Sequence, residues 1–353
     1  MNNNNIKRPN FLIILADDMG FSDAGCYGGE INTDNLDKLA ENGLRFTQFY
    51  NTARCWPSRS CIMTGYYAQQ VRMDPRYGDS LPSWTSLMPH YLNPLGYRCY
   101  HSGKWHIMNA PMPVRDGGFD KSYMLNDHNR FFAPKKHRED DQPLPPVKEG
   151  VDYYATTAFA DHAIKCLQEH EQEHADQPFF EYLAFTSPHF PLHAPQEDID
   201  KYRGEYDEGW DVIRKRRWQK LQDMGIVSCN LPPLEPEVIP GWNLPPEELK
   251  EKIGSGEAAR AIPWDELTEE QQNFQAEKMA IHAAMIDRMV QEIGRVIDQV
   301  KDMGEFENTV IMFMSDNGAS AEQINRGDEH DPSAAPGSGD TFLCLGPGWS
   351  TSS

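Results

Sequence analysis

The sequence has no long apolar run and comparatively few basic residues. Nowhere in its 353 residues is there a stretch near the roughly 20 consecutive apolar residues of a membrane-spanning helix. Lys and Arg together number 33, against 54 Asp and Glu, for a formal net charge of -21. Because nucleic acids and anionic membranes attract clustered Lys and Arg, we expect no nucleic acid and no membrane as a partner. An anionic substrate would require a site that concentrates positive charge locally.

The N-terminal residues also lack the features of an export signal. Residues 1–10, MNNNNIKRPN, contain neither the n-region nor the h-region of a signal peptide. We expect a disordered start over 1–10. The compartment stays unknown: cytoplasmic as written, periplasmic or secreted if an export signal was removed. The seven cysteines have no disulfide or zinc-site spacing, so we expect most of them to be free and buried.

Strand patterns alternate with helical patterns along the chain. Continuous apolar runs, typical of strands buried on both faces, occur at 11–16, 179–185 and 310–314, with further strands expected at 44–50 and 97–100. Helical periodicity predicts helices over 33–42, 58–70, 152–170 and 271–302. This alternation predicts an α/β fold with a doubly wound, mostly parallel sheet and helices on both faces.

Polar residues directly follow four of the predicted strands. Asp17-Asp18, the segment His101–His106, His189 and Asp316-Asn317 each come just after an apolar run. In open α/β sheets the ligand site lies at the carboxyl ends of the strands. We therefore expect these four clusters to meet at one edge of the sheet.

Two of these clusters offer only oxygen ligands. Asp17, Asp18, Asp316 and Asn317 suit Ca²⁺ or Mg²⁺, whereas zinc usually recruits His or Cys. Taken alone, either pair is more typical of a helix cap or a turn. Together, each after a buried strand, they predict a divalent-cation site.

The segment Cys55–Gly65 reads CWPSRSCIMTG. It resembles the signature of the type I, formylglycine-dependent sulfatases, in which C-x-P-S-R is followed by aliphatic residues and T-G. In that family the cysteine is oxidised to formylglycine, and the hydrated aldehyde attacks sulfur. A gem-diol supplies one hydroxyl for attack and a second to expel the sulfate, so that covalent catalysis can turn over.

The resemblance implies an arylsulfatase-like sulfuric ester hydrolase with an alkaline-phosphatase-like fold. It implies a sulfated small molecule or glycan as substrate and a formylglycine-generating maturation enzyme as partner. The cofactor would be Ca²⁺, with Mg²⁺ possible, and its ligands would be Asp17, Asp18, Asp316, Asn317 and residue 55, the converted Cys55.

The resemblance also suggests roles for the remaining polar residues. Arg59 would brace the anionic group, and Lys104 would hold a sulfate oxygen. His189 would contact the sulfate or protonate the leaving alkoxide, with His193 as the alternative substrate-binding histidine. His106 would assist the nucleophile or the breakdown of the sulfo-enzyme intermediate.

The expected organisation is a catalytic domain over 11–349, with 350–353 as a truncated end and the family's C-terminal subdomain missing. Within it, the Trp-rich segment 197–270 is expected to be an insertion that lines the substrate rim, where tryptophans could stack on sugar rings. The basic run 214–217 is expected to be a solvated helix face.

Two other functions stay open at this point. One is a phosphatase or phosphodiesterase of the alkaline phosphatase superfamily. Those enzymes normally place Ser or Thr at the nucleophile position and bind two zinc ions, which Cys55 and the oxygen-only ligand set disfavour. The other is a non-catalytic fragment that binds anions or glycans.

Overall fold

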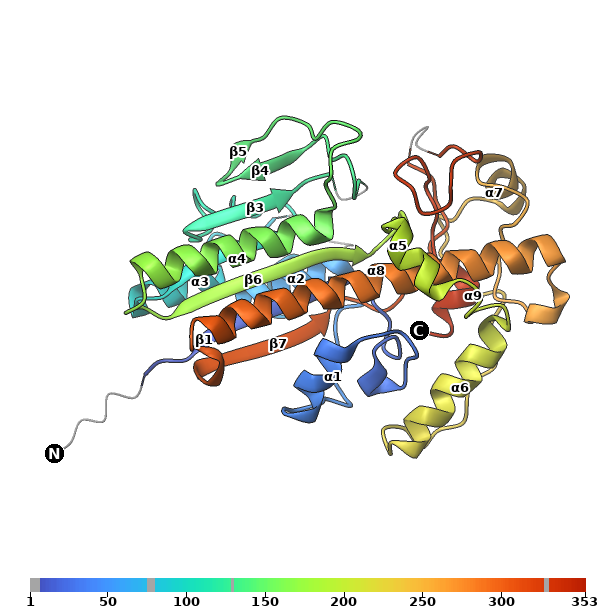
Figure 1. The fold of residues 1–353 in the computed structure, drawn as a ribbon, viewed down its shortest axis with the longest axis horizontal. Helices are drawn as coiled ribbons and strands as arrows, with labels where there is room; N and C mark the ends of the chain where they lie inside the picture. The colour runs from blue at the N-terminus through green and yellow to red at the C-terminus, as the bar shows by residue number, and fades with distance from the viewer. Residues whose placement is uncertain (1–6, 75–79, 128–129, 327–329) are drawn as a thin grey trace.

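The computed structural model describes residues 7–74, 80–127, 130–326 and 330–353, which form one mixed sheet with helices on both faces (Figure 1). The seven strands of the described residues lie in the order β5-β4-β3-β2-β6-β1-β7; the β3–β4 and β4–β5 pairs are antiparallel and the other four pairs are parallel. Their bounds are β1 Asn10–Asp17, β2 Arg98–Gly103, β3 Lys121–Leu125, β4 His137–Glu139, β5 Gln142–Pro143, β6 Phe179–Pro188 and β7 Thr309–Ser315.

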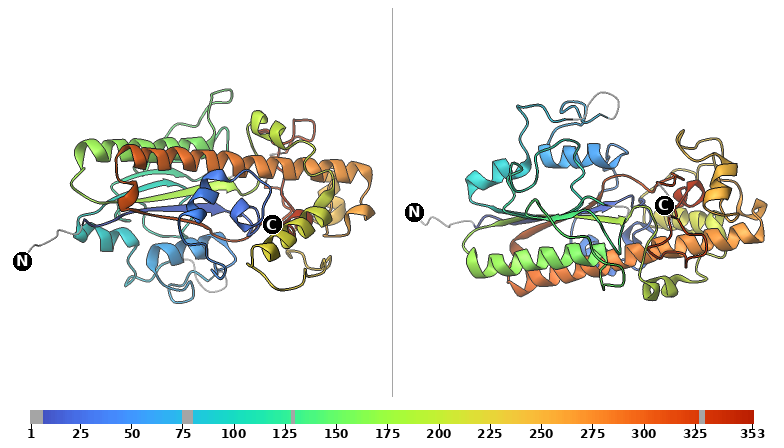
Figure 2. Two further views of the ribbon diagram at one scale, coloured as in Figure 1. Left: turned by 60° about the horizontal axis from the view of Figure 1, so that its bottom comes forward. Right: turned by 90° about the horizontal axis from the view of Figure 1, so that it is seen from above.

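The α-helices of the described residues are α1 Asp34–Glu41, α2 Cys55–Thr64, α3 Met88–Leu92, α4 Ala155–Glu173, α5 Gln196–Ile199, α6 Gly209–Asp223, α7 Pro246–Lys252, α8 Glu269–Asp302 and α9 Pro347–Ser350. Short 3-10 turns occur at Gly25–Tyr27, Asn93–Leu95, Asp200–Tyr202, Trp264–Glu266 and Phe306–Asn308. Helices α4 and α8 cover one face of the sheet, and α2 and α3 lie on the other (Figure 2). The predicted α/β architecture is confirmed. None of these helices combines the length and apolarity that crossing a bilayer requires.

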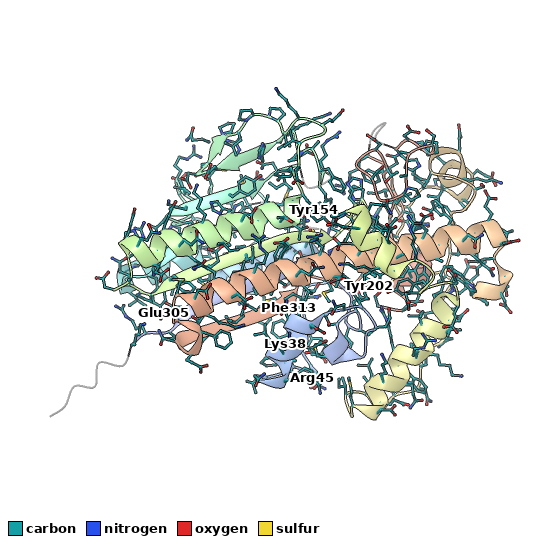
Figure 3. The ribbon with its side chains drawn as sticks, in the orientation of Figure 1. Lys38, Arg45, Tyr154, Tyr202, Glu305 and Phe313 are labelled. Carbon is teal, nitrogen blue, oxygen red and sulfur yellow. The ribbon has the colours of Figure 1, made fainter. Side chains whose placement is uncertain are left out.

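The long helix α8 begins and packs as its sequence predicts. The Thr268 side chain accepts a hydrogen bond from the backbone N–H of Gln271, and the Gln271 side chain accepts one from the backbone N–H of Thr268. These two hydrogen bonds form a capping box. The apolar stripe of the helix is buried against α4 and the sheet. Further along, Asp287 accepts a 3.1 Å hydrogen bond from Tyr202, whose position appears in Figure 3. This contact ties the start of the 197–270 segment to the main helix.

Strand β1 lies between β6 and β7, and Ile14 pairs with Leu183 on one side and Phe313 on the other. Its continuous apolar run is buried on both faces, as expected for a central parallel strand. The expectation that 310–314 lies inside the sheet is wrong. Within the described residues β7 pairs only with β1, so it is an edge strand, and Val310 is 42% exposed.

Three other expectations need correction. Residues 44–50 form no strand; their apolar side chains are exposed, because no neighbouring strand pairs with this segment within the described chain. The helix expected over 58–70 is α2, which ends at Thr64 because Gly65 adopts the left-handed conformation with φ 73°. The disordered start expected over 1–10 ends sooner, since Asn10 already belongs to β1. Residues 1–6 lie outside the described residues.

Candidate functional site

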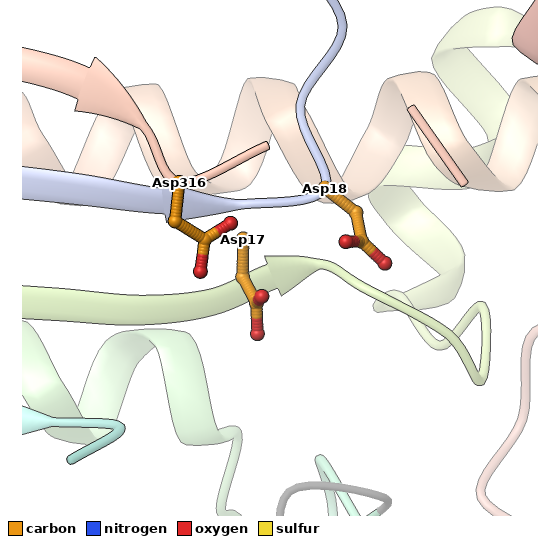
Figure 4. Close-up of side chains that lie close together, drawn as sticks. All are labelled: Asp17, Asp18 and Asp316. Atoms are coloured by element: carbon orange, nitrogen blue, oxygen red, sulfur yellow. The ribbon is translucent and has the colours of Figure 1, made fainter. Parts of the chain in front are cut away.

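Three buried carboxylates meet at the carboxyl ends of β1 and β7. Asp17 ends β1, Asp18 follows it, and Asp316 comes directly after β7. The two strands are parallel and adjacent, and their register pairs Ala16 with Ser315, so Asp17 and Asp316 leave the sheet side by side. One carboxylate oxygen from each residue lies within 4.8 Å of the others (Figure 4). The sheet topology thus produces the convergence that the strand ends predicted.

The fourth expected ligand joins the same cluster. The side-chain amide of Asn317 contacts Oδ1 of Asp18. Asp18 itself adopts a left-handed backbone conformation with φ 67°, which is uncommon for a residue other than glycine. Backbone strain of this kind concentrates at functional sites, where surrounding contacts hold it in place.

Arg59 links helix α2 to the carboxylates. Its Nε donates a 2.8 Å hydrogen bond to Oδ2 of Asp316, and its Nη2 lies 3.5 Å from Oδ1 of Asp17. The guanidinium is fully buried, and its Nη1 donates to the carbonyl oxygen of Lys104 at 2.9 Å. Cys55 lies four residues earlier on the same helix, so it occupies the same helix face as Arg59.

Lys104 reaches the cluster from the end of β2. Its ammonium group contacts Oδ2 of Asp17, and its backbone N–H donates to the carbonyl oxygen of Ala184 at 2.7 Å. The preceding residue, Gly103, has φ 122°, and a Cβ there would lie 1.9 Å from that same carbonyl oxygen. Only glycine permits this close approach, which sets the position of Lys104.

His189 lies beside the cluster, with Nε2 3.9 Å from Oδ2 of Asp18. His193 points elsewhere: its Nε2 makes a 2.6 Å hydrogen bond with the carbonyl oxygen of Thr341, and its ring packs against Phe131 and Phe132. The geometry therefore favours His189 over His193 as the histidine of the site.

His106 is partly buried next to charges of the cluster. Burial and the charges of Lys104 and Arg59 lower the pKa of His106 to about 2, and burial and Lys104 lower the pKa of His189 to about 3. Both imidazoles are therefore neutral at pH 7.

The three carboxylates are not equivalent. Burial disfavours ionised Asp17, but Lys104, His189 and Arg59 outweigh it and hold its pKa far below the ordinary value. Burial and the neighbouring carboxylates raise the pKa of Asp18 well above the ordinary value, and burial and Asp17 raise the pKa of Asp316 to about 7. Like charges this close in a buried site cannot all ionise without a counter-cation.

The donor set fits a hard divalent cation. Oδ1 of Asp17 and Oδ1 of Asp316 are buried and accept no hydrogen bond within the described part of the chain. Carboxylate and amide oxygens are the ligands that Ca²⁺ and Mg²⁺ prefer. A cation bound there would satisfy both oxygens.

The thiol of an unmodified Cys55 is protonated at neutral pH in this environment. Burial raises the pKa of its thiol to about 11, although Lys104 acts in the opposite direction. Its interactions with Lys104, Asp17, Asp316 and Arg59 place it within the electrostatic field of the cluster. An unmodified Cys55 would be a protonated and weak nucleophile at neutral pH.

Sequence reasoning missed a buried contact of α6. Arg217 was expected on a solvated helix face, yet it is buried and lies 2.7 Å from Asp23 and from Glu30. A run of four basic residues does not reveal which of them turns inward, and the partners are far away in the sequence. A cavity of about 430 Å³ near Met112 and Arg138 contains none of the site residues.

The chain is similar to known proteins along most of its length. Residues 9–343 match the family model described as Sulfatase. The chain is 37% identical over 350 residues to an uncharacterized sulfatase of Schizosaccharomyces pombe, covering 90% of this chain and 59% of that protein. It is 32% identical over 343 residues to an arylsulfatase of Klebsiella aerogenes, covering 90% of this chain and 68% of that protein. The chain thus spans about six-tenths to two-thirds of the length of these relatives.

Solved structures share the fold. The crystal structure of Ps i-CgsB in complex with k-i-k-neocarrahexaose superimposes with a TM-score of 0.60 at 22% identity, covering 89% of this chain and 59% of that chain. The putative sulfatase yidJ from Bacteroides fragilis gives a TM-score of 0.58 at 20% identity, covering 88% and 62%. The architecture is therefore alkaline-phosphatase-like, and the chain belongs to the sulfatase family.

Proposed function

We propose that the chain carries the catalytic centre of a sulfuric ester hydrolase, in which residue 55 acts as formylglycine. One arrangement carries this proposal: Cys55 and Arg59 lie on one face of α2, and Arg59 binds the carboxylate of Asp316. The nucleophile position, two buried cationic side chains and three carboxylates thereby share one site. Burial raises the pKa of the unmodified thiol to about 11 and so makes it a weak nucleophile at neutral pH, whereas an aldehyde hydrate would not depend on a thiolate.

Asp17, Asp18, Asp316, Asn317 and residue 55 would hold Ca²⁺ or Mg²⁺. Such a cation would neutralise the carboxylates and withdraw electron density from a bound sulfate oxygen. Arg59 fixes the orientation of Asp316 and Asp17 through its contacts with both side chains. Lys104, held against Asp17, adds a positive charge that attracts and orients the sulfate group.

The two histidines would assist the reaction in different ways. His189, 3.9 Å from Asp18, is neutral at pH 7, because burial and Lys104 depress the pKa of its imidazole. An anionic ester bound beside it opposes the effect of Lys104 and raises that pKa, so His189 would gain a proton with the substrate and deliver it to the leaving alkoxide. His106, whose pKa of about 2 keeps it neutral, would assist the hydroxyl of residue 55 as a hydrogen-bond acceptor.

The substrate would be an aryl or carbohydrate sulfate monoester. Among relatives, the Klebsiella aerogenes protein is named an arylsulfatase, and a Bacteroides thetaiotaomicron protein that is 26% identical is named an N-acetylglucosamine-6-O-sulfatase. A maturation enzyme that oxidises cysteine to formylglycine would be the required partner.

Hydrolysis of 4-nitrophenyl sulfate and 4-nitrophenyl phosphate tests the proposal. The parent protein, produced together with a formylglycine-generating enzyme, should hydrolyse the sulfate much faster than the phosphate. Cys55→Ala should abolish that activity and leave the circular dichroism spectrum unchanged. Faster hydrolysis of the phosphate would favour a phosphatase, and binding of both esters without turnover would favour a non-catalytic fragment.

A further inference from the structure

An exposed tryptophan of the 197–270 segment lies next to the residue that precedes the nucleophile position. Trp242 is 60% exposed, and the guanidinium carbon of Arg54 lies 5.8 Å from the centroid of its ring. Arg54 is the N-cap of α2, and Cys55 is the first residue of that helix. Trp242 therefore belongs to the rim of the site, although about 190 residues separate it from Cys55 in the sequence.

The position of Trp242 is fixed by the loop that follows the Asp316-Asn317 pair. Its indole N–H donates to the carboxylate of Glu322. Asn243 donates to the carbonyl oxygen of Ala321 at 3.0 Å, and the backbone N–H of Leu244 donates to the carbonyl oxygen of Gln323 at 2.9 Å. These contacts join the rim segment to the loop that extends from the carboxylate cluster.

That loop is anchored in turn to a buried ion pair. The side chain of Gln323 donates to Glu257 at 3.1 Å, and Glu257 lies 2.7 Å from the ammonium group of Lys278 on α8. Both charged groups are buried. Trp242 is thus a solvent-exposed aromatic ring on a rigid support, which limits the conformational entropy lost when a ligand stacks on it.

Arg54 offers an available positive charge at the same place. Arg54 is exposed, its guanidinium group lies over the ring of Trp242, and it forms no ion pair with a carboxylate among the described residues. In a chain with a formal net charge of -21, an exposed guanidinium that no described carboxylate pairs with, next to residue 55, is well placed to bind an anion.

We propose that Arg54 and Trp242 form a subsite for the sugar of a sulfated carbohydrate that bears a second anionic group. The proposal rests on the function proposed above and narrows its substrate class. The indole face of Trp242 would pack against the apolar face of a pyranose ring, and the planar guanidinium of Arg54 would form paired hydrogen bonds to a second sulfate or a carboxylate. Small aryl sulfates lack that second group.

Binding to the Cys55→Ala protein tests the subsite without turnover. The probes are D-glucosamine-2-N,6-O-disulfate, D-glucosamine 6-sulfate and 4-nitrophenyl sulfate, titrated by calorimetry in the presence of calcium. We expect the disulfate to bind most tightly. Trp242→Ala should weaken binding of both sugars about tenfold. Arg54→Gln should reduce the preference for the disulfate over the monosulfate about tenfold.

Trp218→Ala is the matched control, because Trp218 lies on α6 in the same segment and donates to the carbonyl oxygen of Cys229. It should leave all three affinities unchanged. The subsite is contradicted if 4-nitrophenyl sulfate binds as tightly as both sugars, or if Trp242→Ala and Trp218→Ala have equal effects. Turnover of 4-nitrophenyl sulfate by the parent protein tests the proposed sulfatase function separately. The subsite proposal and the proposed function can therefore fail independently of each other.

Discussion

Arg59 and Asp316 are 257 residues apart in the sequence, yet two nitrogens of the guanidinium, Nε and Nη2, each lie 2.8 Å from one carboxylate oxygen, Oδ2 of Asp316. The pair joins the helix that begins at Cys55 to the strand end that carries a predicted metal ligand. Both side chains are buried, so neither charge is screened by solvent.

Arg59→Lys should test the importance of this geometry. Lysine keeps the positive charge but cannot place two donors against Asp316 while reaching the carbonyl oxygen of Lys104. We expect hydrolysis of 4-nitrophenyl sulfate to fall about hundredfold. Arg203→Lys, in an exposed ion pair with Asp200, is the control and should retain the parent rate. Equal rates for the two variants would show that charge alone suffices at position 59.

Calcium should raise the melting temperature of the parent protein, because a ligand that binds only the folded state stabilises it by mass action. Asp316→Asn removes one charged ligand and should reduce this shift, whereas Asp200→Asn at an exposed position should not. An undiminished shift in the Asp316→Asn protein would mean that the ligand set is wrong.

The calcium affinity should also depend on pH. The pKa of Asp316 is raised to about 7 by burial and by Asp17, so protons compete with the cation below that value. We therefore expect the calcium-dependent melting shift to shrink as the pH is lowered from 8 to about 6. A shift that is constant over this range would argue against Asp316 as a ligand.

Glu181 should make the protein less stable as the pH rises. This buried residue of β6 accepts a 3.0 Å hydrogen bond from Ser102, and burial raises its pKa from 4.5 to about 8. Between these values the folded state holds a proton that the unfolded state releases, so the free energy of unfolding falls with increasing pH. In the parent protein the free energy of unfolding should fall by on the order of 3 kcal/mol between pH 5 and pH 9. Glu181→Gln should remove this fall.

Urea unfolding at several pH values measures this effect. Glu171→Gln, at an exposed position of α4, is the control and should follow the parent protein. If the Glu181→Gln and parent proteins lose stability in parallel as the pH rises, Glu181 is not the titrating group.

Arg217 should be a structural residue of the 197–270 segment. Replacing it with methionine leaves the buried carboxylate of Asp23 without the ion pair that now compensates it. We expect a loss of about 3 kcal/mol in the free energy of unfolding. Arg216 lies on the same helix as Arg217 and forms an exposed ion pair with Glu208. Arg216→Met should lower the free energy of unfolding by less than about 1 kcal/mol. Similar losses for both variants would show that burial of Arg217 contributes little.

Much of the core could be predicted because local pattern and tertiary environment agree there. The apolar run of β1 and the stripe of α8 appear where the sequence indicates. The carboxylate cluster could also be predicted, since the carboxyl ends of adjacent parallel strands share one edge. The motif at Cys55 identified the remaining active-site candidates through family resemblance.

Other features depend on partners that the local sequence does not specify. Residues 44–50 have a strand-like composition, but a strand needs a neighbour, and this segment has none within the described residues. His193 lies only four residues from His189, yet its ring turns toward Thr341. The contact between Arg54 and Trp242 joins segments far apart in the chain, so only the folded structure reveals it.

The central claim is that residue 55, as formylglycine, is the nucleophile of a sulfatase. The most direct test is the rate of 4-nitrophenyl sulfate hydrolysis, measured across preparations that differ in the fraction of residue 55 converted. Mass spectrometry gives that fraction, because formylglycine is about 18 Da lighter than cysteine. The rate should rise in proportion to the converted fraction and extrapolate to zero when no residue 55 is converted. A preparation that contains only unmodified Cys55 and hydrolyses the ester at the full rate would contradict the account.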